Sequence, residues 1–77
     1  MSKSKVKINE SCIWSIARYV RWANEETQRN GRVNDYTKQC VMYYVRAMFS
    51  CGIKVDRKRI YETNYLTSLV RDYIKEN

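Results

Sequence analysis

The chain has 77 residues, enough for one domain, and a domain of this size buries only about 60–65% of the surface that its unfolded form exposes. Hydrophobic residues make up 44% of the sequence and aromatic residues 13%, which argues against wholesale disorder. Fifteen Lys and Arg against eight Asp and Glu give a net charge of +7, which favours nucleic acid or an acidic protein surface as a partner.

The N-terminal residues 1–7, MSKSKVK, are expected to form a flexible basic tail ahead of a single domain at 8–77. This stretch lacks the apolar run of a secretory signal, and the chain has three cysteines, which cannot all pair with one another. No apolar stretch approaches the roughly 18–20 residues that span a bilayer. A soluble protein of the reducing cytoplasm is therefore expected, with no membrane partner.

Residues 9–30 are predicted to form a helix. Asn9 is a candidate N-cap, Ile8 and Ile13 occupy the positions of a hydrophobic staple, and Gly31 can take the left-handed conformation that closes a helix. Apolar side chains recur at helical spacing from residue 13 onwards, so one face of this helix should contact a core.

Residues 34–52 are predicted to form a second helix, which Asn34 or Asp35 can cap and Gly52 can close. It is apolar around most of its circumference, with a polar side marked only by Gln39, Arg46 and Ser50. A helix of this kind belongs between two neighbours. We therefore expect the second helix to be central.

A third helix is predicted from Asp56, a plausible N-cap, to about residue 75. The alternative is a break at Thr63-Asn64, since either side chain can cap a new helix. Together the three segments predict an all-α fold, a small three-helix bundle whose second helix lies in the middle.

Cations are dense at the start of the third segment, in KVDRKR at 54–59. The helix dipole disfavours cations there, whereas a phosphate backbone across that turn would favour them. If the helix is continuous, residues spaced by three and four from 57 to 75 form one stripe without an acid, suited to the DNA major groove. The candidate nucleic-acid-binding residues are Lys54, Arg57, Lys58, Arg59, Tyr61, Asn64, Ser68, Arg71 and Lys75, with Arg18 and Arg21 adding phosphate contacts. Plain solvent-exposed surface is the competing interpretation, and a helix-turn-helix at Gly52 fits poorly because the connection looks too long.

RYVRW, at 18–22, is the second candidate site. Trp22 falls nearly opposite the predicted core face of the first helix, with Arg18 beside it. Tyr19, Trp22 and Arg18 are residue types that dominate protein interfaces, so they are candidate contacts to an acidic protein partner. In the competing interpretation, the tail, the third helix or a second subunit covers Trp22.

Catalysis is not expected, because the chain has no histidine to activate a thiol, no Gly-rich phosphate loop and no cysteine spacing typical of zinc. No metal or cofactor is predicted. The resulting hypothesis is a small basic accessory or regulatory protein that binds nucleic acid, with DNA favoured over RNA. The alternative is a small inhibitor or adaptor that binds an acidic protein. Either role is compatible with a homodimer, and the richness in Lys, Asn, Ile and Tyr resembles the composition of accessory proteins of phages and mobile elements.

Overall fold

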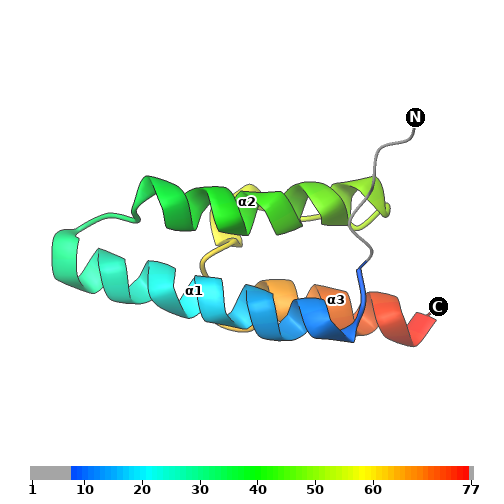
Figure 1. The fold of residues 1–77 in the computed structure, drawn as a ribbon. Helices are drawn as coiled ribbons and strands as arrows, with labels where there is room; N and C mark the ends of the chain where they lie inside the picture. Colours follow the sequence, from blue (N-terminus) through cyan, green and yellow to red (C-terminus); the bar gives the residue numbers. More distant parts are fainter. Residues whose placement is uncertain (1–7, 77) are drawn as a thin grey trace.

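The computed structural model describes residues 8–76, within which three α-helices are joined by two connections (Figure 1). Helix α1 spans Glu10–Asn30, α2 spans Asp35–Ser50, and α3 spans Tyr65–Glu76. One 3-10 turn, η1, covers Arg57–Arg59. No strand occurs in this part of the chain, so the predicted all-α three-helix bundle is confirmed. The basic tail at 1–7 and the last residue of the predicted domain, at 77, lie outside the described residues.

Helix α1 begins and ends where its sequence predicts. The Asn9 side-chain Oδ1 accepts hydrogen bonds from the Ser11 backbone N–H (3.0 Å) and the Ser11 hydroxyl (2.6 Å), which satisfies a donor of the first turn. At the other end Gly31 adopts a left-handed φ of 82°, and its N–H donates to the Thr27 carbonyl at 2.8 Å. Ile8 is buried and Ile13 packs against the core, as the predicted staple requires.

Helix α2 closes with a Schellman motif around Gly52. The Gly52 N–H donates to the Phe49 carbonyl and the Ile53 N–H donates to the Met48 carbonyl, both at 3.0 Å. Gly52 has a φ of 85°, which a residue with a Cβ rarely adopts. The predicted end of the second helix is therefore confirmed, and the chain leaves α2 in a sharp reversal.

Glu26 fastens the start of α2 to α1. Its carboxylate accepts hydrogen bonds from the Asn34 backbone N–H (2.9 Å), the Asn34 side-chain amide (3.2 Å) and the buried Thr37 hydroxyl (2.8 Å). Hydrogen bonds to a charged acceptor are among the stronger ones in proteins. This carboxylate is consequently engaged between the two helices.

The predicted start of the third helix at Asp56 is wrong, and the alternative break at Thr63-Asn64 is what the structure contains. The Asp56 carboxylate accepts from the Lys58 N–H at 3.0 Å, but it caps only η1. The chain then turns through Asn64, whose φ is 69°, and α3 begins one residue later. Long-range contacts explain the break: Ile60 is buried, and the Tyr61 carbonyl accepts from the Asn24 side chain at 3.0 Å. Continuing the helix would compete with these contacts.

The central helix is α1, not α2 as predicted. Helix α1 contacts both α2 and α3, with α3 beside the N-terminal half of α1, whereas α2 and α3 do not approach each other comparably (Figure 1). The connection at 51–64, and not a third helix, lies along one flank of α2. Its residues Ile53, Val55 and Ile60 pack against the core. The outer face of α2 is left uncovered. The largest fully buried aliphatic and thioether side chains are Ile16, Val41, Val45, Met48, Leu66 and Val70.

Candidate functional site

The predicted groove-reading stripe does not exist as a single helical face. Because α3 begins at 65, the stripe residues at 57, 61 and 64 belong to the preceding connection. Tyr61 is half-buried, and Asn64 forms the left-handed turn ahead of α3. On α3 itself only Ser68, Arg71 and Lys75 remain as the exposed stripe. The helix-turn-helix alternative fails for the same reason, since residues 51–64 separate α2 from α3 instead of a tight turn.

The basic turn at 54–59 is exposed, as its sequence predicts, but its cations have different surroundings. Arg59 is engaged: its Nε lies 3.1 Å from the Glu62 carboxylate, and its guanidinium lies 4.3 Å from the centre of the Tyr65 ring. The Arg57 guanidinium instead lies 5.7 Å from the centre of the Phe49 ring of α2. Lys54, Arg57 and Lys58 therefore remain available to an anion from solvent, whereas Arg59 already has an anionic partner in Glu62.

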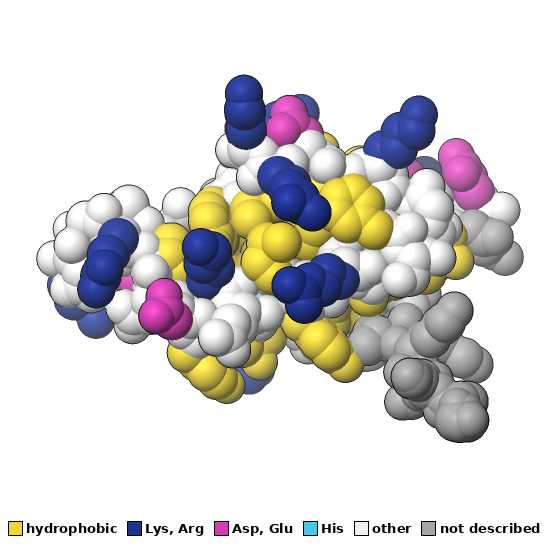
Figure 2. All heavy atoms as spheres, turned by 90° about the horizontal axis from the view of Figure 1, so that it is seen from above, with side chains coloured by type: hydrophobic (Ala, Val, Ile, Leu, Met, Phe, Trp, Pro, Cys, Tyr) yellow, Lys and Arg dark blue, Asp and Glu magenta, His cyan; other side chains and the backbone are white. Residues whose placement is uncertain are grey.

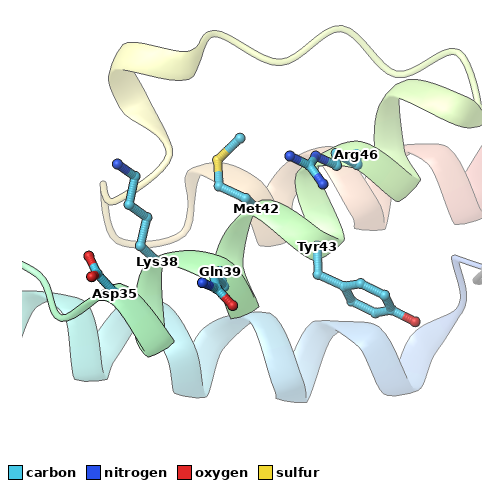
Figure 3. A pocket seen from close by; sticks show the side chains of 6 residues that line it. All are labelled: Asp35, Lys38, Gln39, Met42, Tyr43 and Arg46. Carbon is cyan, nitrogen blue, oxygen red and sulfur yellow. The ribbon is translucent and has the colours of Figure 1, made fainter.

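The outer face of α2 carries a shallow hollow of about 580 Å³. Its lining residues follow one another at helical spacing along the uncovered side of the helix (Figure 3). The Lys38 and Arg46 side chains rise from this face two turns apart, with Met42 between them (Figure 3). The hollow is lined by Asp35, Lys38, Gln39, Met42, Tyr43 and Arg46.

This hollow and the basic turn lie side by side. The connection after α2 returns alongside that helix (Figure 3). The Arg57 guanidinium, 5.7 Å from the centre of the Phe49 ring, joins the two segments. Figure 2 views the molecule from the α2 side and shows Lys and Arg side chains standing over a largely hydrophobic surface. We call this region the α2–η1 surface. It consists of Lys38, Met42, Tyr43, Arg46, Phe49, Lys54, Arg57 and Lys58.

The cations of this surface are not paired with carboxylates. Within residues 8–76 the ion pair between Arg59 and Glu62 is the one that brings Lys or Arg nitrogen within 4.0 Å of a carboxylate oxygen. Asp35 lines the same hollow and Asp56 caps η1, but neither carboxylate forms an ion pair with a cation of this surface. The positive charge of the α2–η1 surface is thus available to an external anion.

Sequence reasoning missed part of this surface. It placed the polar side of the second helix at Gln39, Arg46 and Ser50, but it expected neighbours on two sides and did not assign Lys38 or Tyr43 to a site. The spacing of three and four between residues 35, 38, 39, 42, 43 and 46 was a usable signal. It would have indicated one face that combines cations with apolar and aromatic side chains.

The second candidate, at 18–22, is only partly exposed. The Trp22 side chain is 40% exposed and packs edge-on against Tyr19, with ring centres 5.5 Å apart. Tyr19 in turn packs against Tyr44 of α2, so it belongs to the α1–α2 contact more than to the surface. Arg18 and Arg21 are exposed on α1. The most exposed large hydrophobic side chain among the described residues, Trp14 at 78%, also lies on α1 and was not assigned to a site.

A smaller hollow of about 300 Å³ lies beside this aromatic contact and is lined mainly by tyrosines. Partial burial raises the pKa of Tyr19 above its ordinary value, and Cys40 adds to the effect. A side-chain hydrogen bond with Cys40 raises the pKa of Tyr36. These phenols therefore stay neutral at physiological pH. The hollow is lined by Tyr19, Tyr36, Gln39, Cys40, Tyr43 and Tyr44.

Across 8–76 no three Cys, Asp or Glu side chains come together as metal ligands would. No helix in the same range is long and apolar enough to cross a bilayer. Comparison of the chain with protein-family models, with curated proteins and with solved structures finds no match.

Proposed function

We propose that this protein binds nucleic acid through the α2–η1 surface, where the cations contact the phosphate backbone. The observation that carries the proposal is the set of unpaired cations beside the hollow of α2. Lys38 and Arg46 come from the helix, and Lys54, Arg57 and Lys58 come from the connection that returns beside it. Phosphate contacts of this kind supply most of the sequence-independent affinity for nucleic acid.

The remaining predicted residues have secondary roles in this proposal. Arg59 forms an ion pair with Glu62 and packs over the Tyr65 ring, so we assign it to the edge of the site. Arg18 and Arg21 on α1, and Arg71 and Lys75 on α3, lie on other helices and add to long-range attraction. Insertion of α3 into the major groove is not retained, because the predicted stripe from 57 to 75 is divided between the connection and α3.

A fluorescence-anisotropy titration tests the proposal with two variants that lose the same positive charge. A surface variant replaces four cations of the α2–η1 surface: Lys38→Gln, Arg46→Gln, Arg57→Gln and Lys58→Gln. A control variant replaces four exposed cations on α1 and α3: Arg21→Gln, Arg29→Gln, Arg71→Gln and Lys75→Gln. All eight side chains are exposed, so both variants should fold, and far-ultraviolet circular dichroism checks this.

The surface variant should lose most of the affinity for labelled oligonucleotides at about 50 mM salt, while the control variant should lose only a minor part. An absence of binding by the wild-type protein to both single and double strands at that salt concentration would refute the proposal. An equal loss in the two variants would show that net charge acts without a defined site.

A second candidate function is binding of an acidic protein through the tyrosine-lined hollow and Trp22. It is favoured by the contact between Tyr19 and Trp22 and by the hollow of about 300 Å³ beside it. Trp22→Ala separates the two functions, because Trp22 is not part of the α2–η1 surface. Unchanged oligonucleotide binding by a folded Trp22→Ala protein is expected, and a loss of binding would move the site towards α1.

A further inference from the structure

The Tyr43 ring lies at the surface beside the hollow of α2 and packs against a second ring. Its side chain is 54% exposed, and the ring packs edge-on against Tyr44 with ring centres 5.3 Å apart and planes at 85°. It lines both the hollow that contains Lys38 and Arg46 and the tyrosine-lined hollow. Tyr43 thus offers an aromatic ring, already oriented by its neighbour, to a planar group that enters from solvent.

Lys38 precedes Tyr43 and Arg46 follows it on the same helix, and all three residues line the hollow. Lys38 and Arg46 are eight residues apart, which corresponds to about 12 Å along α2. A stacked strand advances by about 3.4 Å per nucleotide and an unstacked strand advances further, so this distance spans at most three to four nucleotides. Phosphates at the two cations would therefore leave an intervening base within reach of Tyr43.

The charges around the hollow favour one direction for a nucleic-acid strand that extends beyond it. Asp35 lies at the N-terminal end of the hollow and would repel a phosphate. At the C-terminal end the surface continues to Phe49, over which the Arg57 guanidinium lies. A planar guanidinium is itself a platform for a base, so the route from Tyr43 towards Arg57 is both cationic and able to stack bases.

We infer that the α2–η1 surface binds single-stranded nucleic acid in preference to duplex, by stacking an unpaired base on Tyr43 while Lys38 and Arg46 hold neighbouring phosphates. This inference rests on the proposed function and deepens it. In a duplex the bases are stacked on one another, so their faces are closed to Tyr43 and only phosphate contacts remain. Every unpaired base has a free face, so stacking tolerates different sequences.

The size of the preference follows from the contribution of one stacked base. Loss of a base–aromatic contact typically weakens single-strand binding by about 5- to 150-fold per base. The affinity of the wild-type protein for a single strand should exceed its affinity for a duplex of the same length by a factor in this range. Replacing the ring should remove the difference.

The test uses the full chain and labelled oligodeoxythymidylate of about 12 nucleotides, within the usual range of site sizes for single-strand binders. A duplex of equal length serves as the second probe. Tyr43→Leu removes the aromatic ring and keeps an apolar side chain, and Tyr43→Phe is the matched control that keeps the ring. Tyr43→Leu should weaken single-strand binding by about 5- to 150-fold and leave duplex binding unchanged, while Tyr43→Phe should bind as the wild-type protein does.

The possible outcomes separate the inference from the function on which it rests. Binding to neither probe at low salt would overturn the proposed function and this inference with it. Equal binding to both probes, or tighter binding to the duplex, would overturn the inference alone, as would a folded Tyr43→Leu protein with wild-type affinity for the single strand. If Tyr43→Leu fails to fold, the ratio of the wild-type affinities for the single strand and the duplex still tests the inference.

Discussion

Removal of the four cations in the surface variant should flatten the salt dependence of binding as well as weaken it. Five cations of the α2–η1 surface lie outside any ion pair in the described structure: Lys38, Arg46, Lys54, Arg57 and Lys58. If each neutralises one phosphate of a single strand, the plot of log K against log salt has a slope of about −3.5. Affinity then falls about a hundredfold between 50 and 200 mM salt.

The surface variant retains only Lys54 of these five cations. Its slope should be about −0.7, so the same change of salt would weaken binding only about two- to threefold. Anisotropy titrations of labelled oligodeoxythymidylate at four salt concentrations measure both slopes, and the control variant should stay near −3.5. A surface variant that binds weakly but keeps the steep slope would refute the assignment of these side chains to phosphate contacts. So would a control variant whose slope is equally shallow.

Three further predictions concern the framework that holds this surface. Thr67 is 5% exposed and its hydroxyl has no hydrogen-bond partner among the described residues. Thr67→Val should therefore raise the free energy of unfolding by about 1 kcal/mol in urea denaturation. A destabilised variant would mean that the hydroxyl is hydrogen-bonded in solution. The Asn24 side-chain amide donates to the carbonyls of Val20 (2.9 Å) and Tyr61 (3.0 Å). Asn24→Ala should therefore lower the free energy of unfolding in urea denaturation by about 1–2 kcal/mol, and the exposed Gln28→Ala serves as the neutral control. Partial burial, and secondarily the charge of Glu26, raises the pKa of Tyr61 above 10.0, so the folded protein disfavours the phenolate. The stability linked to this group is therefore present below about pH 10 and lost as pH rises through the raised pKa; Tyr61→Phe should flatten the alkaline decline in urea midpoint, and an unchanged decline would assign it to other groups.

Local signals in the sequence were sufficient to predict the first two helices. Asn9, Gly31 and Gly52 each act within a few residues of their own position, through a side-chain cap or a left-handed φ, so their effect can be recognised without the rest of the fold. The start of α3 could not be decided in this way. Asp56 and Asn64 were both plausible starts, and the choice depends on the distant bond from Asn24 to the Tyr61 carbonyl.

The candidate site was predicted less well than the fold, for a related reason. The exposure of the basic turn followed from its own composition, but which of its cations stay unpaired depends on Glu62 and Tyr65 for Arg59 and on Phe49 for Arg57. Apolar residues around α2 were interpreted as a sign of two covering neighbours. In the structure some of them are aromatic side chains that remain at the surface, such as Tyr43.

The break before α3 and the exposure of α2 have one cause, and it bears directly on the proposed site. A continuous helix from Asp56 would have carried Arg57, Lys58 and Arg59 on a straight rod together with the α3 stripe. Instead residues 51–64 return beside α2 and anchor Ile53 and Ile60 in the core, which leaves too little chain for a helix that could cover the outer face of α2. The same path places Arg57 over Phe49. The cations of the connection and the rings of α2 therefore meet on one surface because the third helix is short.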